Sequence, residues 1–190
     1  KMTKQGEWLY GADETEVADD SAFVIDPASY SQGYIAWDDD SNVIGEEMAV
    51  AGSAPILLVD LPDLPAGCKW DAQVAFALKG IEGGEEGEQM IYKASSKGGK
   101  DAMATLLAAI IKRAKAGETE LCPVVLLDKT SYKHKKYGKI FTPILTVDAW
   151  MEMPEDGAEP EPVAKVEPEP VAEPEPVVEP KRARRSRKAV

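Results

Sequence analysis

The sequence predicts an α+β fold, a small β-barrel with one main helix, within a folded body of residues 1–153. Residues 70–79 alternate apolar side chains with small or polar ones at a period of two, as expected of a strand with one face in the core. Residues 95–117 carry apolar side chains at helical spacing. Strands expected before and after this helix give the element order β-β-β-α-β-β.

The first third of the chain is predicted to form short strands joined by polar turns. These strands are placed at residues 22–25, 33–37 and 43–50, with at most a short one at 56–59. Pro27 ends the first of them, because proline cannot continue a central strand. Prolines and glycines make residues 51–69 an ordered connection rather than a long strand.

The period-two stretch assigns its side chains to two faces. Ala72, Val74, Phe76 and Leu78 are expected in the core. The opposite face carries Gln73, Ala75, Ala77 and Lys79, and its two alanines make it shallow enough for the floor of a groove. A turn rich in glycine and glutamate follows, and then a strand at residues 88–93.

The helix has recognisable ends. Asp101 lies near its start, basic residues Lys112, Arg113 and Lys115 lie in its last turn, and Gly117 ends it. Two further strands are predicted after the helix, a buried one at 122–127 and a long one at 139–150, separated by a lysine-rich loop.

This order matches that of an oligonucleotide-binding barrel (OB-fold), in which the helix lies between strands three and four. Such barrels bind their ligands through the loops between strands one and two and between strands four and five. The loop from Lys129 to Lys139 is then the four-five loop. A generic α+β sandwich gives a similar order of elements and stays open as an alternative.

The lysine-rich loop reverses the sign of a chain whose net charge is −12. Lysines alternate with rings in it, and the candidate contacts are Lys129, Tyr132, Lys133, Lys135, Lys136, Tyr137 and Lys139. Phosphates require cations and unpaired bases stack on rings, so this pattern predicts an interface for single-stranded nucleic acid. A lysine-rich, solvated hairpin tip is the simpler alternative.

Other residues extend the predicted nucleic-acid interface. SSKGGK, residues 95–100, opens the helix with free amides and lysines, which favours phosphate contact, although it lacks the spacing of a nucleotide-binding P-loop. A plain, flexible helix start is the alternative for it. The candidates added to the interface are Lys93, Lys97, Lys100, Phe141, Trp37 and Trp70.

Residues 154–190 are predicted to be a disordered tail, because Glu-Pro repeats remove backbone donors and repel one another. The tail ends in KRARRSRK, which is either a nonspecific nucleic-acid arm or a basic patch without a role. Removing the tail's 9 acidic and 7 basic residues from the chain's 34 and 22 leaves the body at −10. Nucleic-acid binding by so acidic a body requires a segregated basic face.

Several functional classes lack the residues they need. His134 is the sole histidine and lies among lysines, so no hydrolase triad is expected, and we predict a protein that is not an enzyme and binds no metal or cofactor. The DDDSN turn at 38–42 lacks the glycine and the glutamate of a calcium loop. Cys68 and Cys122 are expected as reduced thiols in the cytoplasm, and no membrane segment is predicted.

The segments GEWLYG, GYIAW, WDAQVAFALKG, SSKGGK and SYKHKKYGKIFTPI make the body resemble bacteriophage and prophage proteins of the single-stranded DNA-binding type. The resemblance covers most of residues 6–150. It implies an accessory role in DNA replication or recombination in an infected bacterium, together with phage or host proteins of those processes. The basic end of the tail departs from the acidic tip common among single-strand-binding proteins.

We therefore expect a non-catalytic protein that coats single-stranded DNA with little sequence preference. The choice between DNA and RNA, the site size and the oligomeric state stay open. The alternative is a phage structural or host-interaction protein whose lysine-rich loop binds an acidic protein partner.

Overall fold

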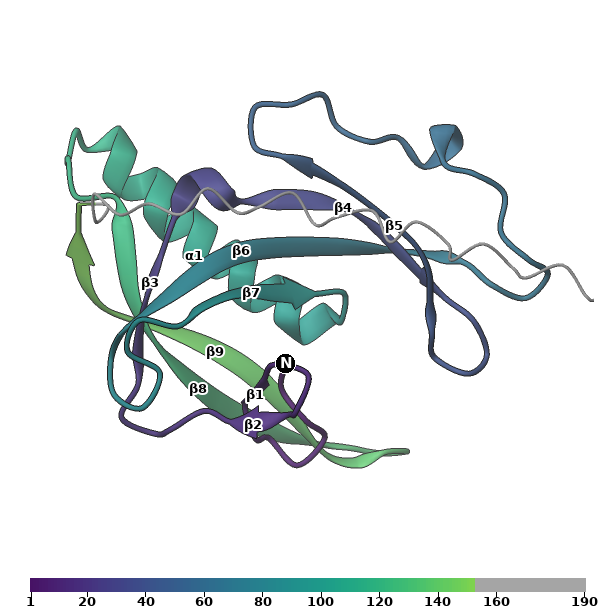
Figure 1. The fold of residues 1–190 in the computed structure, drawn as a ribbon, viewed down its shortest axis with the longest axis horizontal. Helices are drawn as coiled ribbons and strands as arrows, with labels where there is room; N and C mark the ends of the chain where they lie inside the picture. Colours follow the sequence, from purple (N-terminus) through teal and green to yellow (C-terminus); the bar gives the residue numbers. More distant parts are fainter. Residues whose placement is uncertain (153–190) are drawn as a thin grey trace, which may run out of the picture. The chain divides into compact units, whose positions relative to one another are not determined.

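The computed structural model describes residues 1–152, and the predicted tail, residues 154–190, lies outside the described residues. Within the described part the fold is α+β, with antiparallel strands and a single α-helix (Figure 1). The strands are β1 (Leu9–Tyr10), β2 (Thr15–Glu16), β3 (Ala22–Ile25), β4 (Ser31–Trp37), β5 (Val43–Val50), β6 (Trp70–Glu82), β7 (Gln89–Ala94), β8 (Cys122–His134) and β9 (Gly138–Met151). The helices are α1 (Lys97–Lys115) and the 3₁₀ turns η1 (Pro27–Ser29) and η2 (Leu58–Asp60).

The long strand β6 organises the sheet. One edge of β6 pairs first with β4 and then with β3, and its other edge pairs with β7. Between β3 and β4 the chain makes the 3₁₀ turn η1, and there the Ser29 hydroxyl accepts the Ala77 N–H at 2.9 Å, which fills the gap in the ladder. β3 and β4 therefore act as one interrupted strand along β6.

The interrupted strand connects two extensions of the sheet. β5 pairs only with β4, and the β8–β9 pair joins through β3, so the strand order is β5-β4-β6-β3-β8-β9 with β7 on the other side of β6. In Figure 1 the β4–β5 pair and the turn end of the β8–β9 pair both extend toward the right of the view.

The core lies between the sheet and α1. The helix contributes Met103, Leu106 and Ile110, which pack against side chains of β3, β6, β8 and β9. Phe76 and Leu78 are buried as predicted from the period-two pattern. Ser96 caps the helix by accepting the Gly99 N–H at 3.2 Å, and the helix ends just before Gly117, as the sequence indicates.

Residues 1–152 form no closed barrel. β7 pairs only with β6 and β9 only with β8, so the strands that would close the barrel stay apart. Trp8 bridges this opening, because its ring lies 5.5 Å from the Tyr92 ring on β7 and its Nε1 donates to the Asp128 carbonyl on β8 at 3.2 Å. The expected closed barrel is replaced by an open sheet filled by a side chain from the N-terminal segment.

Residues 56–59, where at most a short strand was expected, form no strand, and the 3₁₀ turn η2 begins there, in a segment where prolines interrupt pairing. Two local predictions were wrong. The lysine-rich segment is mostly strand, since β8 continues to His134 and β9 begins at Gly138. Ala72 is exposed rather than in the core, on the part of β6 that precedes its pairing with β7 at Val74.

The predicted groove floor on the opposite face of β6 is covered as well. Gln73 is buried there, and its amide donates to the Glu46 carboxylate at 2.5 Å. Glu46 reaches this position across Gly33, which pairs with Gln73 and has no side chain. A Cβ at Gly33 would lie 1.9 Å from the Glu47 carbonyl oxygen, so only glycine permits this close strand approach.

Tyr92 connects the open side of the sheet to α1. Burial raises the pKa of its phenol to about 12 from the ordinary value near 10. The folded state therefore holds the proton more tightly than the unfolded state, and this contribution to stability is present below pH 10 and lost as the pH rises toward 12.

We expect Tyr92→Phe to remove this alkaline effect. Between pH 9 and 11.5 the wild-type free energy of unfolding should fall by about 2 kcal/mol more than that of the variant, measured by urea unfolding. Equal pH dependence in the two proteins would contradict the assignment.

Candidate functional site

The lysine-rich segment forms a two-stranded hairpin that we call the lysine hairpin, residues 129–139. Lys133 pairs with Lys139 and His134 with Gly138, and Gly138 adopts a left-handed φ of 76° at the turn. The His134 Nδ1 accepts the N–H groups of Lys136 at 3.1 Å and Tyr137 at 3.2 Å. The histidine therefore holds the turn, a role that the sequence analysis missed because it considered the imidazole only as a catalytic base.

The ammonium groups of the lysine hairpin keep their charge available. Its five lysines are exposed, and no ion pair within residues 1–152 involves any of them. Two of the ammonium groups lie near rings instead, that of Lys136 at 5.2 Å from the Tyr137 ring centre and that of Lys139 at 4.4 Å from Phe141. Cations and rings thus share one surface.

The two tyrosines of the hairpin are open to solvent. Tyr132 is 53% and Tyr137 66% exposed, and one face of the Tyr137 ring stacks on His134 at a centre distance of 4.8 Å. A solvent-exposed ring that is supported by a stacked imidazole is a suitable platform for a nucleobase.

A groove of about 950 Å³ lies beside β9, on the open side of the sheet. Its walls are the β9 side of the lysine hairpin, the end of β7, the first turn of α1 and residues 1–4. Six of the predicted contacts line it: Lys93, Lys97, Tyr132, Tyr137, Lys139 and Phe141. Lys4, Tyr92 and Ser96 also line it, and no sequence signal placed them beside β9 because the open side is formed only by the tertiary arrangement.

The glycines of SSKGGK serve packing at this groove. A Cβ at Gly98 would lie 2.8 Å from Cγ2 of Thr142, so the glycine lets the helix start approach β9 closely. Lys100 points away from the groove and donates to the Ala72 carbonyl at 3.2 Å. Of the three lysines added around the helix start, Lys93 and Lys97 reach the groove and Lys100 does not line it.

Lys93 and Lys97, which line the groove, are already paired with carboxylates. The Lys93 ammonium lies 2.8 Å from both carboxylate oxygens of Glu46, and the Lys97 ammonium lies 2.5 Å from Asp101. The hydrogen bond to Asp101 raises the pKa of Lys97. Positive charge is therefore free on the lysine hairpin, whereas Lys93 and Lys97 are each paired with a carboxylate.

Three predicted ring platforms have other contacts. Phe141 packs against Gly6, where an added Cβ would lie 2.6 Å from the ring. Trp70 packs against Gly45 and its Nε1 donates to the Pro62 carbonyl at 3.1 Å, and Trp37 pairs with Val43 on the β4–β5 extension. Trp37 and Trp70 do not line the groove, so the structure does not bring them together with the lysine hairpin.

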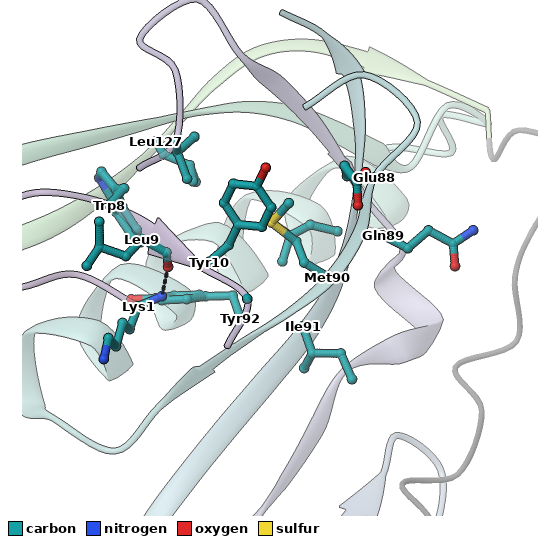
Figure 2. Close-up of a pocket in the computed structure, with 13 residues that line it drawn as sticks. Lys1, Trp8, Leu9, Tyr10, Glu88, Gln89, Met90, Ile91, Tyr92 and Leu127 are labelled. Carbon is teal, nitrogen blue, oxygen red and sulfur yellow. Dashed lines mark hydrogen bonds between the residues drawn. The ribbon is translucent and has the colours of Figure 1, made fainter. Parts of the chain in front are cut away.

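A second, smaller pocket of about 520 Å³ lies along the outer edge of β7 (Figure 2). Tyr10 and Met90 line it together with Trp8, Leu127 and Tyr92. Tyr92 also lines the groove, so the two hollows share a wall. None of the predicted contact residues lines this second pocket.

The DDDSN turn is held by its own side chain. Asp38 Oδ1 accepts the backbone N–H groups of Asp40 at 3.0 Å and Asn42 at 2.8 Å, and Oδ2 accepts the Asn42 side-chain amide at 3.0 Å. These bonds, led by that from the Asn42 side chain, lower the pKa of Asp38. Residues 1–152 contain no cluster of three or more histidine, cysteine or acidic side chains suited to a metal. No helix within the same residues has the length and apolarity to cross a membrane.

Comparison of the chain with protein-family models, with curated proteins and with solved structures gave no significant match. The candidate interface is therefore defined by its own geometry: a free cationic hairpin with two exposed rings, next to a groove on the open side of the sheet.

Proposed function

We propose that this chain is a non-catalytic, phage-type single-stranded DNA-binding protein that acts in the bacterial cytoplasm during replication or recombination. The observation that carries the proposal is the lysine hairpin, with five exposed lysines free of carboxylate partners within residues 1–152 and two exposed tyrosines. Such a surface offers phosphate contacts and base stacking without reading sequence.

The order of strands supports an OB-like interpretation of the fold. With β3 and β4 taken together as the first strand, the sheet order is third, second, first, fourth and fifth, and α1 lies between the third and fourth. The lysine hairpin then corresponds to an extended four-five loop, and the β4–β5 extension belongs to the one-two connection. The groove lies where strands three and five would meet in a closed barrel.

Binding of oligo-dT and of duplex DNA of equal length tests the proposal, by gel shift at 50 and 200 mM salt. With five lysine contacts the single-strand affinity should fall with salt at a slope near −3.5, since each contact contributes about 0.7. Equal or stronger binding to duplex would contradict it. Polyglutamate should compete only weakly, because it lacks rings, and strong competition would favour the acidic protein partner.

The carboxylate that pairs with Lys93 leads to a separate prediction. Glu46→Gln removes the counter-ion of Lys93, so one more cation becomes free in the groove, and oligo-dT affinity should rise about fivefold near 0.1 M salt.

Glu47→Gln is the matched control, because Glu47 follows Glu46 on β5, is exposed and makes no ion pair within residues 1–152. The two variants have the same net charge. An equal gain in both would show that overall charge, rather than the release of Lys93, changes the affinity.

A further inference from the structure

A second surface with a chemical character opposite to that of the lysine hairpin lies at the β4–β5 extension. We call residues 38–68 the acidic wing, comprising β5, η2 and the connections around them. These residues include seven acidic side chains and no lysine, arginine or histidine. The carboxylates are those of Asp38, Asp39, Asp40, Glu46, Glu47, Asp60 and Asp63.

The acidic wing is also apolar and uncovered. None of its residues is buried, and β5 pairs with β4 alone among the described residues, so the other edge of β5 has free backbone groups. Exposed large apolar side chains gather on it: Val43, Ile44, Val50, Leu57, Leu58 and Val59, the last 86% exposed. Apolar patches of this kind mark interaction surfaces in soluble proteins.

The carboxylates of the wing are mostly available for a partner. Asp38 holds its own turn and Glu46 pairs with Lys93. The other five make no side-chain hydrogen bond or ion pair within residues 1–152. A partner for this surface must therefore supply positive charge together with rings or apolar side chains.

The lysine hairpin has this complementary chemistry. It offers five exposed cations and the exposed rings of Tyr132 and Tyr137, whereas the basic end of the tail, residues 181–188, contains no aromatic or large aliphatic side chain. Within one molecule no ion pair joins the hairpin to the wing in the described part. A hairpin bound to the wing would therefore come from another molecule.

We propose that the acidic wing of one copy binds the lysine hairpin of a second copy, in a head-to-tail contact. Because the two surfaces differ, the contact is heterologous and can continue from copy to copy. It uses the same hairpin as the proposed DNA interface, so single-stranded DNA and the wing exclude one another on that hairpin.

Sedimentation velocity of the full chain without DNA tests the contact. The association constant at 50 mM salt should fall about tenfold or more at 300 mM, because the attraction is electrostatic. A protein that stays monomeric at high concentration and 50 mM salt overturns the proposal. Since no DNA is present, this result is independent of the proposed DNA-binding function.

Charge reversal identifies the two surfaces. K133E/K135E/K136E reverses the hairpin and E47K/D60K/D63K reverses the wing, and each variant alone should lose association at least about tenfold. An equimolar mixture should recover it, because each protein then provides what the other lacks. Recovery also shows that both variants fold, and failure of the mixture to associate overturns the head-to-tail contact.

Two further experiments test whether the tail binds the wing and whether DNA competes for the hairpin. Replacing the basic residues of 181–188 by serine should leave association unchanged, and its loss would assign the wing to the tail and overturn the proposal. Adding oligo-dT to the wild type should dissociate the copies as DNA takes the hairpin. Association that persists in both charge-reversed variants would place the contact elsewhere and also overturn it.

Discussion

Replacing Lys133, Lys135 and Lys136 with glutamine should lower the affinity for oligo-dT roughly 100-fold at 0.1 M salt. The three ammonium groups are exposed on the lysine hairpin and free of carboxylate partners within residues 1–152. Each contributes about 0.7 to the salt slope of a single-strand complex, so the slope should also become shallower by about 2. Gel-shift titrations at several salt concentrations measure both quantities.

A matched triple variant, Lys69, Lys112 and Lys115 to glutamine, provides the control. These lysines are also exposed, with Lys69 paired to Asp71 at 2.9 Å, and none of them lies on the hairpin or lines the groove. The control carries the same change in net charge. If it weakens binding as much as the hairpin variant does, the DNA contact does not depend on the hairpin.

Removing the rings of Tyr132 and Tyr137 together, by substitution with alanine, should weaken oligo-dT binding by about 2–6 kcal/mol, because each stacked base contributes about 1–3 kcal/mol. The salt slope should stay unchanged, since no cation is lost. This separates the stacking contribution from the electrostatic one, and the same gel-shift series measures both.

Y132F/Y137F is the control at the same positions. Phenylalanine keeps the ring and loses only the hydroxyl, so its affinity should stay close to that of the wild type. The hairpin turn should survive in both variants, because His134 accepts backbone N–H groups at residues 136 and 137. A large loss in the phenylalanine variant would mean that the hydroxyls, rather than the rings, contact the ligand.

The proposed head-to-tail contact and the proposed DNA interface share the lysine hairpin, so charge variants of the wing and of the hairpin should have different effects. Variants of the acidic wing should change self-association and leave the hairpin free for DNA, whereas variants of the hairpin should change both. Glu46 belongs to the wing by sequence but faces the groove through Lys93, and for that reason it is absent from the wing variant.

Local patterns in the sequence predicted much of the fold. The period-two pattern placed Phe76 and Leu78 in the core, and helical spacing with a terminal glycine predicted α1. Both succeed because alternation and helix ends depend on residues close in the chain. The cationic, ring-bearing character of residues 129–139 was likewise visible from local composition.

The surroundings of those residues were decided by tertiary structure. Whether an ammonium group is free depends on carboxylates far away in sequence, and Lys93 is paired with Glu46, 47 residues earlier. The opening of the sheet is bridged by Trp8, which contacts Tyr92 and the Asp128 carbonyl. The sequence by itself determined which residues carry charge and rings, and long-range packing decided which of them share a surface and which are already paired.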